Sequence, residues 1–349
     1  MLQINYLLWY NKLGGKMKVL LYTEFKKQIG KSGLGKAIQH QMRALEDNNI
    51  EYTTKKSDDY DIVHINFYGP KSYLMAKKAK RKNKKVIYHA HSTEEDFRNS
   101  FIFSNKLAPL FKWWICKCYS LGDHIITPTP YAKKLLEGYG LTNITAISNG
   151  IDTKFFEKDD NLGEIFRVKY GYKKEDKVIM GIGLYLERKG ILDFVELAKR
   201  LKEYKFIWFG YTDLKIVPKK IREAVTTKLP NLTFAGYVEP LTIKSALSGA
   251  DLYIFPTLEE TEGIPIMEAC ACKQRAIIRD IPVFDGWLED KVNVYKAKDV
   301  DDFEVKIKKI LNNELKDLTD KAYEVAKSRD VKKVGKELIE VYKEVLEEK

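Results

Sequence analysis

Two carboxylates stand on either side of a glycine turn in the second half of the chain. Glu260 and Glu268 are separated by a stretch that includes Gly263, Ile264 and Pro265, and they follow a short apolar run. Proline suits the first turn of a helix, where its missing N–H would have no partner. The pattern therefore predicts a strand, a turn that exposes backbone N–H groups, and a helix that contains Glu268. Compensation of a helix dipole would also place acidic residues here, but carboxylates that flank exposed N–H groups favour a ligand with vicinal hydroxyls, such as a nucleotide sugar.

A glycine-rich turn lies near the beginning of the chain. The segment from Gly30 to Ala37 follows a predicted strand, precedes a helical pattern and nearly matches a phosphate-binding loop. Ala37 stands where a serine or threonine hydroxyl would hold magnesium, so a nucleotide hydrolase is disfavoured. Gly33 and Gly35 would still let the backbone approach a diphosphate at the start of the helix. A tight turn without a ligand is the alternative.

Arg188 and Lys189 form a second candidate phosphate site. They follow a predicted strand that ends at Gly183, and they precede another helical pattern. Two fixed cations at a strand end could neutralise a leaving diphosphate, whose negative charge grows as a sugar departs. Taken alone, such a pair is more often solvated surface.

The composition indicates a globular chain of two domains. Its 349 residues are more than a single core usually holds, since cores rarely grow beyond ~250 residues. Four cysteines in two Cys-x-Cys pairs favour free thiols in a reducing cytosol over disulfides or a zinc site. The net charge of +12 attracts anionic partners, among them nucleic acid, a membrane surface or a phosphorylated substrate. Residues 1–16 lack the cleavage site of a signal peptide, and we expect them to be a non-native or untranslated extension before Met17.

Short apolar runs alternate with helical patterns twice along the chain. The alternation is typical of parallel strands joined by crossover helices, and a polar stretch near residues 149–163 separates the two series. We therefore expect one Rossmann-like domain in residues 17–155, a second in residues 156–328, and a C-terminal helix in residues 329–349 that packs back toward the first. Ligands of such sheets bind at the carboxyl ends of the strands, so two facing sheets would hold a ligand in a central cleft.

Together these motifs resemble glycosyltransferase family 4. Glu260 and Glu268 around Gly-x-Pro are similar to the donor motif of that retaining family, which has the two-domain GT-B fold. The resemblance covers nearly the whole chain from Met17, including the first glycine loop and the Ser-Asn-Gly-Ile-Asp segment at 148–152. It implies an α/β enzyme with two doubly wound Rossmann-like domains that face a central cleft.

The resemblance also implies roles for single residues on the donor side. Glu260 would contact the hexose hydroxyls of the donor, Glu268 the ribose, and Lys189 the diphosphate. Gly263 and Ile264 would offer backbone N–H groups. These residues would make up most of the donor site.

Two further positions follow from the same resemblance. His91 matches the cleft histidine of the family, with a buried structural imidazole as the alternative and His89 as the nearer competitor. The family usually has arginine directly after the strand glycine, where this chain has Leu184. Arg188 would then supply the second cation.

No metal site is expected. The formal Asp-x-Asp pair at Asp59 and Asp61 precedes a predicted strand and reads as a surface turn. With retaining chemistry and no evident base, we expect same-face displacement, in which the departing diphosphate takes the proton of the acceptor and cations stabilise its charge.

Basic and aromatic residues gather in the first half of the chain. Seven of the nine residues 77–85 are cations, and residues 101–119 mix Phe, Trp and Lys with leucines. Such mixtures suit a bilayer interface with anionic lipid, whereas a solvated helix end and a core helix are the alternatives. The predicted membrane contacts are Lys77, Lys78, Lys80, Arg81, Lys82, Lys112, Trp113 and Trp114.

Within the family, several segments resemble bacterial glycolipid synthases that add a hexose to monoglucosyl-diacylglycerol. The resemblance implies a cytoplasmic hexosyltransferase, peripheral on the inner face of the cell membrane, that uses UDP-glucose or UDP-galactose. No cofactor would be required, and stimulation by Mg²⁺ is left open. A polyprenyl-linked or polysaccharide acceptor is the alternative. A nucleic-acid-binding protein would explain the charge but would leave Glu260, Glu268 and His91 without a role, so no nucleic-acid partner is expected.

Overall fold

A computed structural model describes residues 17–24 and 32–347. The chain divides into two compact units. The first unit contains the described residues up to His91, then Trp113–Gly150, and those from Val331 onward. The second unit contains Ser92–Lys112 and Ile151–Asp330. The predictions for residues 1–16 and for Gly30 lie outside the described residues.

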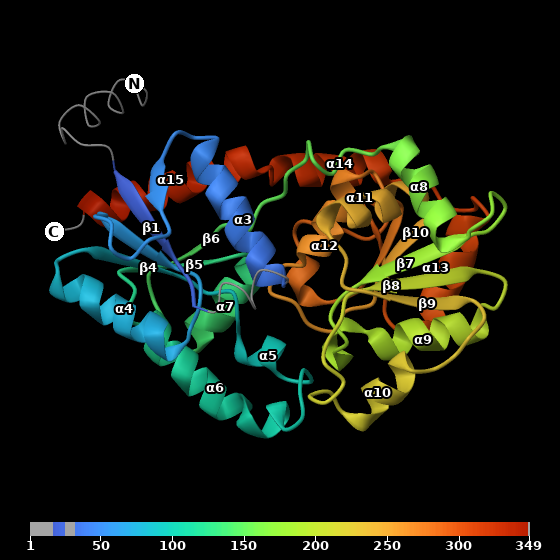
Figure 1. Ribbon diagram of the computed structural model, residues 1–349, viewed down its shortest axis with the longest axis horizontal. Helices are drawn as coiled ribbons and strands as arrows, with labels where there is room; N and C mark the ends of the chain where they lie inside the picture. Colours follow the sequence, from blue (N-terminus) through green and yellow to red (C-terminus); the bar gives the residue numbers. More distant parts are fainter. Residues whose placement is uncertain (1–16, 25–31, 348–349) are drawn as a thin grey trace. The chain divides into compact units, whose positions relative to one another are not determined.

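The first unit is built on a parallel sheet with the strand order β2-β1-β3-β4-β5-β6. Figure 1 shows α3 and α15 on one face of this sheet and α4 on the other. The strands are β1 Lys18–Tyr22, β2 Glu51–Thr53, β3 Ile62–Ile65, β4 Lys85–His89, β5 His124–Thr127 and β6 Ile144–Ala146. The helices are α3 Gly33–Glu46, α4 Pro70–Arg81, α6 Ser104–Tyr119, α7 Pro130–Gly138 and α15 Val331–Glu347, with α6 beginning in residues of the second unit.

Helix α15 closes the core of the first unit. Its apolar stripe packs with buried residues of β1, β3 and α3. Gly335 makes a close approach to α3, because a Cβ atom there would lie 2.4 Å from the carbonyl oxygen of Ala44. Val334, Leu338, Val341 and Val345 recur at helical spacing and are buried, so they form the apolar face of this amphipathic helix.

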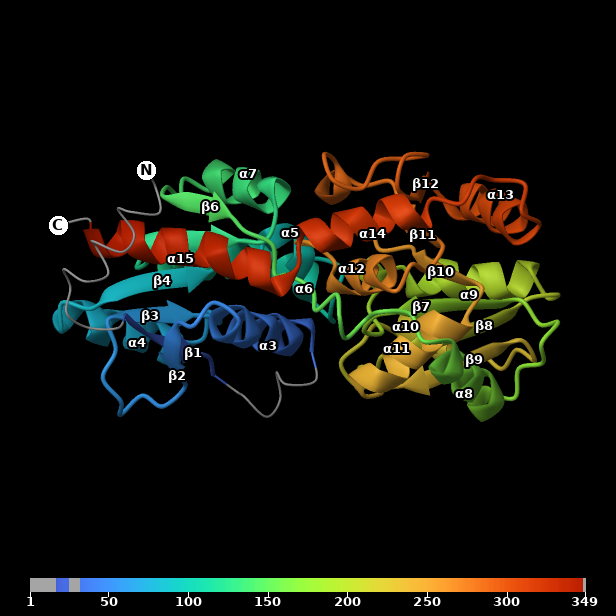
Figure 2. The same ribbon diagram turned by 90° about the horizontal axis from the view of Figure 1, so that it is seen from above.

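The second unit has its own parallel sheet, with the order β12-β11-β10-β7-β8-β9. Its strands are β7 Val178–Ile182, β8 Lys205–Phe209, β9 Leu232–Gly236, β10 Leu252–Phe255, β11 Ala276–Arg279 and β12 Tyr295–Ala297. Its helices are α5 Glu94–Phe97, α8 Asp160–Tyr170, η1 Glu187–Lys189, α9 Ile191–Arg200, α10 Lys219–Val225, α11 Pro240–Gly249, α12 Ile264–Ala271, η2 Pro282–Phe284, α13 Val300–Leu311 and α14 Thr319–Ser328. Helices α9 and α13 share one apolar core with the sheet, and α8 packs against α11, as both views of the ribbon show (Figures 1 and 2).

The order of the strands locates the place where a ligand would bind in each sheet. In the second unit the chain runs outward from β7 to β9 and then returns to β10 on the other side of β7. Ligands of open parallel sheets bind at such a reversal, outside the carboxyl ends of the strands. The corresponding reversal in the first unit lies between β1 and β3. The candidate functional side chains are therefore those in the loops that follow β7 and β10 in the second unit and β1 and β3 in the first.

The expectation of two doubly wound α/β sheets is confirmed. The boundaries at residues 155 and 328 stay predictions, and the division by contacts places residues 92–112 with the second unit instead of the first. The reason is visible in the backbone, because Ile102 N donates to Ile216 O and Arg188 N donates to Asn99 O. Residues 92–112, which follow β4 in the sequence, are thus hydrogen-bonded to loops of the second unit.

Candidate active site

Lys189 and Glu260 meet at the reversal point of the second sheet. Lys189 follows β7 and Glu260 follows β10, and their Nζ and Oε1 atoms are 2.5 Å apart. The two side chains are only 15% and 7% exposed. Thr257 Oγ1 donates to the same carboxylate oxygen at 3.0 Å. A cation and a carboxylate, largely removed from water, therefore stand where a nucleotide ligand of this sheet would bind.

The two loops that carry this pair are fastened to each other through the backbone. Gly190 has a φ of 74°, and a Cβ atom there would lie 2.1 Å from the carbonyl oxygen of Pro256. Leu258 N donates to the carbonyl oxygen of Arg188 at 2.6 Å. Only glycine tolerates this close approach together with the left-handed backbone. Gly190 thus allows the two loops to pack directly against each other, and this packing positions Arg188 and Lys189.

Burial acts against the charge of Lys189. Removal from water lowers its pKa, while the adjacent Glu260 carboxylate acts in the opposite direction. A buried ammonium group needs a nearby anion, and Glu260 supplies one. A diphosphate would be a second anion for the same cation.

Arg188 is held by side chains of residues 92–112, the segment that belongs to the second unit. Its Nε donates to Ser100 Oγ at 2.9 Å, and its guanidinium lies 4.0 Å from Asp96. Asp96 belongs to a capping box with Thr93 at the start of α5. Burial raises the pKa of Asp96, and the positive charge of Arg188 opposes that shift. Arg188 is therefore 14% exposed and oriented by partners far away in the sequence.

The start of α12 supplies the remaining predicted donor residues. Gly263 precedes the helix with a φ of 98°, and Ile264 is its first residue. Glu268 lies on α12 and is fully buried. Burial, and after it the negative charges of Glu268 and Glu260, raise the pKa of Tyr253 on β10 well above its ordinary value. Glu268 and Glu260 thus both disfavour ionisation of Tyr253.

In the first unit, Gly33 and Gly35 lie between β1 and β2, and His91 follows β4, which is the neighbour of β3. Gly33 and Gly35 open α3, where Ser32 Oγ accepts a hydrogen bond from Gly35 N. A Cβ atom at Gly33 would meet no atom of residues 17–24 or 32–347 within 4 Å. His91 follows β4 and its Nε2 lies 2.9 Å from Asn66 Oδ1. His89 stacks on His91, with ring centroids 4.0 Å apart.

The predicted membrane contacts divide into exposed and anchored side chains. Trp113 is 53% exposed, whereas Trp114 is half-buried and its Nε1 donates to Tyr68 O at 2.7 Å. Lys112 lies 3.6 Å from Glu94. The basic residues of α4 are exposed, and among them Lys80 pairs with Asp123 at 3.1 Å.

Several residues near the cations were missed by the sequence patterns. Asp96, Ser100 and Thr257 contact Arg188 or Glu260 but belong to no phosphate or sugar motif. The Thr-x-x-Asp spacing that begins at Thr93 is a helix-capping signal that could have placed Asp96 at the start of a helix. Nothing in the local sequence indicated that this helix belongs with the donor-side loops.

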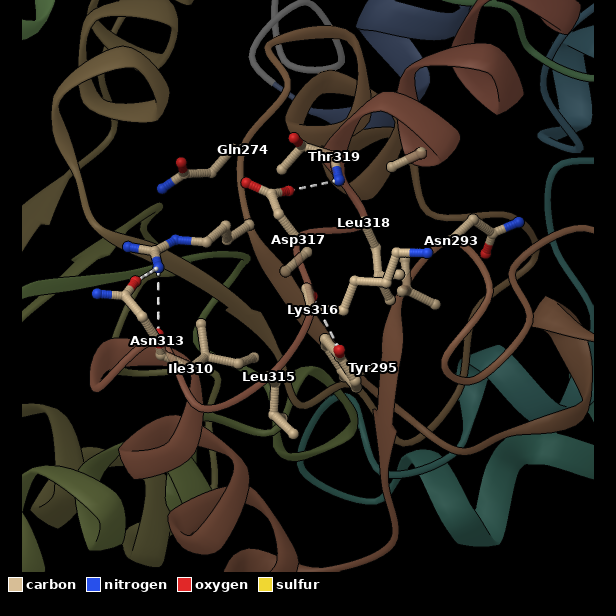
Figure 3. A pocket seen from close by; sticks show the side chains of 14 residues that line it. Gln274, Asn293, Tyr295, Ile310, Asn313, Leu315, Lys316, Asp317, Leu318 and Thr319 are labelled. Atoms are coloured by element: carbon tan, nitrogen blue, oxygen red, sulfur yellow. Dashed lines mark hydrogen bonds between the residues drawn. The ribbon is translucent and has the colours of Figure 1, made fainter.

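A small hollow lies elsewhere in the second unit. It has a volume of about 70 Å³ and is lined by the beginnings of β11 and β12 together with the loop before α14 (Figure 3). Its polar groups are engaged, since Tyr295 Oη donates to Lys316 O and Asp317 accepts from Thr319 N. Ligands of parallel sheets bind at the opposite, carboxyl ends of the strands, so this hollow is not the candidate active site.

Within residues 17–24 and 32–347, no three histidine, cysteine, aspartate or glutamate side chains are grouped so as to hold a metal ion. Over the same residues, no helix has the length and apolar character needed to cross a bilayer.

Comparison with known proteins decides the family. The family described as Glycosyltransferase Family 4 matches residues 41–155, and Glycosyl transferases group 1 matches residues 164–329. A processive diacylglycerol alpha-glucosyltransferase of Acholeplasma laidlawii is 40% identical over 332 residues, which cover 95% of this chain and 99% of the relative. The chain belongs to glycosyltransferase family 4. It is therefore an enzyme of the hexosyltransferase class, as the carboxylate motif indicates.

More distant relatives and solved structures agree with this family. An alpha-galactosylglucosyldiacylglycerol synthase of Streptococcus pneumoniae is 22% identical over 78% of this glycosyltransferase and 75% of its own length. HepE of Anabaena, solved with UDP-glucose, superposes with a TM-score of 0.75 at 15% identity, over 94% of this chain and 100% of that chain. Sucrose-phosphate synthase of Thermosynechococcus elongatus gives a TM-score of 0.77 at 13% identity, over 95% and 99%. These superpositions confirm the expected GT-B fold.

Proposed function

We propose that this glycosyltransferase moves a hexose from a UDP-sugar to a diacylglycerol glycolipid at the surface of a membrane. The observation that carries the donor half is the pair of Lys189 and Glu260 at the reversal point of the second sheet. The acceptor half is supported by the relative at 40% identity, whose name describes glucosyl transfer to diacylglycerol. Monoglucosyl-diacylglycerol is the acceptor we propose first, with a diglycosyl-diacylglycerol as the product.

In the proposed site, Lys189 and Arg188 receive the diphosphate and Glu260 receives the hydroxyl groups of the hexose. Both cations are already fixed by protein partners, so little reorganisation accompanies the growth of negative charge on the leaving group. Glu268 would bind the ribose, and the start of α12 would offer the N–H groups of Gly263 and Ile264. His91 and the turn at Gly33 and Gly35 would contribute from the first unit.

The proposed reaction is a same-face displacement. The bond between the anomeric carbon and the phosphate oxygen breaks, and the acceptor hydroxyl oxygen forms the new glycosidic bond on the same face. The proton of that hydroxyl passes to the departing phosphate oxygen, so no separate base is needed. Arg188 and Lys189 stabilise the resulting UDP. We propose no required metal, and a titration with EDTA followed by Mg²⁺ would measure any stimulation.

Membrane contact is proposed for one face of α6 and for the basic residues of α4. Leu107, Leu110 and Trp113 follow one another at helical spacing, and each is about half exposed or more. Lys117 lies over the Trp113 ring, 4.6 Å from its centroid. Exposed apolar side chains interleaved with lysines suit the interface of an anionic bilayer. The protein would then work from the cytoplasmic face as a peripheral enzyme.

The experiment that tests this function offers each donor to each acceptor. Purified protein would be incubated with UDP-glucose or UDP-galactose and with anionic vesicles that contain diacylglycerol, monoglucosyl-diacylglycerol or a polyprenyl phosphate sugar. We expect transfer to monoglucosyl-diacylglycerol, read as product mass and linkage. Transfer that is confined to the polyprenyl acceptor would replace this proposal by the alternative within the family, and absence of transfer from both donors would refute it.

A further inference from the structure

A series of buried polar side chains connects α15 to β3 in the first unit. Tyr342 on α15 is fully buried, and its hydroxyl lies 2.8 Å from Nδ1 of His64 on β3. Gln41 on α3 places its amide nitrogen 2.9 Å from the same Nδ1 and 3.0 Å from Nε2. His64 itself is fully buried. Polar groups so far from water are retained where their hydrogen bonds specify an arrangement.

The series continues from Gln41 to His91 through a second amide. Asn66 Nδ2 donates to Gln41 Oε1 at 2.8 Å, and Asn66 Oδ1 lies 2.9 Å from His91 Nε2. An asparagine amide has one end that donates and one that accepts. With the nitrogen of Asn66 directed at Gln41, its oxygen is placed to accept a hydrogen bond from His91. This arrangement favours a proton on Nε2 of His91.

Burial favours the uncharged form of the three imidazoles in this region. Burial lowers the pKa of His64 and of His91 to about 3, and it lowers that of His89 well below its ordinary value. The rings are stacked, with centroids 5.3 Å apart for His64 and His89 and 4.0 Å apart for His89 and His91. A neutral imidazole with a proton on Nε2 carries a lone pair on Nδ1.

We propose that Tyr342, His64, Gln41 and Asn66 form a positioning relay that holds His91 as the neutral Nε2–H tautomer. The relay leaves Nδ1 as the nitrogen that His91 offers to a ligand, and that nitrogen accepts a hydrogen bond from a sugar hydroxyl. His91 then orients the sugar without exchanging a proton with it. The proposal rests on the proposed function, because it takes the ligand to be the nucleotide-sugar donor.

The tautomer is measured directly in the ligand-free enzyme. The chain has five histidines, so long-range proton–nitrogen NMR spectra of the full-length, ¹⁵N-histidine-labelled protein are tractable, with a His91→Gln spectrum for assignment. We expect protonated Nε2 and unprotonated Nδ1 at His91, unchanged between about pH 5 and pH 8. A proton on Nδ1, or titration of His91 within that range, would overturn the relay.

Asn66→Asp tests the step next to His91. The carboxylate still accepts from Nε2, but its negative charge favours the imidazolium form and raises the pKa of His91. We expect His91 to begin titrating in the accessible range, with a pH profile for glycosyl transfer that becomes bell-shaped. An NMR titration of His91 identical to that of the unchanged protein would show that Asn66 does not control it.

Tyr342→Phe tests the far end of the relay, with Tyr88→Phe as its matched control. Tyr88 lies on β4, and its buried hydroxyl has no hydrogen-bond partner among the described residues. Loss of one hydrogen bond at Tyr342 should lower kcat/KM for the UDP-sugar about fivefold and mix the two tautomers at His91, while Tyr88→Phe leaves both unchanged. Equal behaviour of the two variants would contradict the relay. The two proposals fail separately. If His91 has the expected tautomer but neither the unchanged protein nor any variant transfers sugar, then the proposed function is wrong and the relay is supported.

Discussion

At the scale of single residues, the proposed chemistry depends on the buried ion pair of Lys189 and Glu260. Each side chain is the counter-ion of the other. A diphosphate and a sugar would each take over one partner, the phosphate Lys189 and the hydroxyl groups Glu260. The pair therefore holds two binding groups in place without leaving either charge uncompensated.

A double-variant cycle separates these two roles. Lys189→Met leaves the Glu260 charge buried without its partner and should destabilise the protein by about 3 kcal/mol. Adding Glu260→Gln to that variant should restore most of the stability, because neither charge remains. Transfer should fall about 100-fold or more in both single variants and in the double variant. Urea unfolding and initial rates would be measured together, and recovery of activity in the double variant would contradict the donor-site assignment.

Arg188 depends on a residue that no motif marks. Ser100→Ala removes the hydroxyl that accepts from its Nε at 2.9 Å. We expect KM for the UDP-sugar to rise about fivefold with little change in unfolding, since one hydrogen bond to a charged group is lost. Ser328→Ala, which removes an exposed hydroxyl bonded to Val325 O on α14, is the control. A KM equal to that of the control would mean that Arg188 is not oriented by Ser100.

At the scale of elements, two helix starts are predicted to bind the same kind of ligand but differ in local geometry. Gly263, before α12, has a φ of 98°, and a Cβ atom there would lie 3.0 Å from the Phe255 ring. A Cβ atom at Gly33, which begins α3, would meet nothing within 4 Å among the residues that the structure describes. The first glycine is required by the backbone, whereas the second is not.

Alanine substitution distinguishes these two cases. Gly263→Ala should reduce stability by about 1–3 kcal/mol, because the side chain is forced into a left-handed backbone. Gly33→Ala should leave thermal unfolding within about 0.5 kcal/mol of the unchanged protein. If Gly33→Ala nevertheless raises KM for the UDP-sugar, the added methyl group obstructs a ligand. An unchanged KM would favour a tight turn without a ligand.

The exposed face of α6 gives a second prediction at this scale. Replacing both Leu110 and Trp113 with serine should weaken binding to anionic vesicles about tenfold or more, because about half of each side chain or more is exposed and neither is needed by the core. Trp114→Phe is the control, since that tryptophan is anchored to Tyr68 O. Vesicle co-sedimentation at fixed salt measures the effect, and unchanged binding of the double variant would remove α6 from the membrane surface.

At the scale of the whole molecule, buried neutral histidines make stability depend on pH. The pKa of His64 is about 3 in the folded protein and about 6.5 in an unfolded chain. The unfolded state therefore binds more protons below pH 6.5, and stability falls as the pH decreases through this range.

His64 alone should cost about 2 kcal/mol of stability at pH 5 relative to neutral pH, from the linkage between its two pKa values. Urea unfolding at a series of pH values measures this loss. A His64→Gln variant should be less stable at neutral pH but should lose less stability on acidification. An equal acid dependence in both proteins would mean that His64 is charged in the folded state.

Local sequence patterns determined the class of the fold and the donor motif. Apolar runs and helical periods report which residues each element must bury, so two series of parallel strands could be predicted from neighbours in the chain. The turn before α12 could be predicted from Gly263 and Pro265, because the backbone preferences of glycine and proline do not depend on tertiary structure. The spacing of Glu260 and Glu268 around that turn needed no tertiary structure.

The tertiary structure decided which residues are partners. Lys189 and Glu260 are 71 positions apart, and Arg188 and Ser100 are 88 apart. Tyr342 and His64 are separated by 278 positions. Sequence periodicity does not extend to such distances, because these contacts depend on how strands are ordered in a sheet and on which helix covers it. The same applies to Trp113 and Trp114, adjacent in sequence, of which packing exposes one and anchors the other.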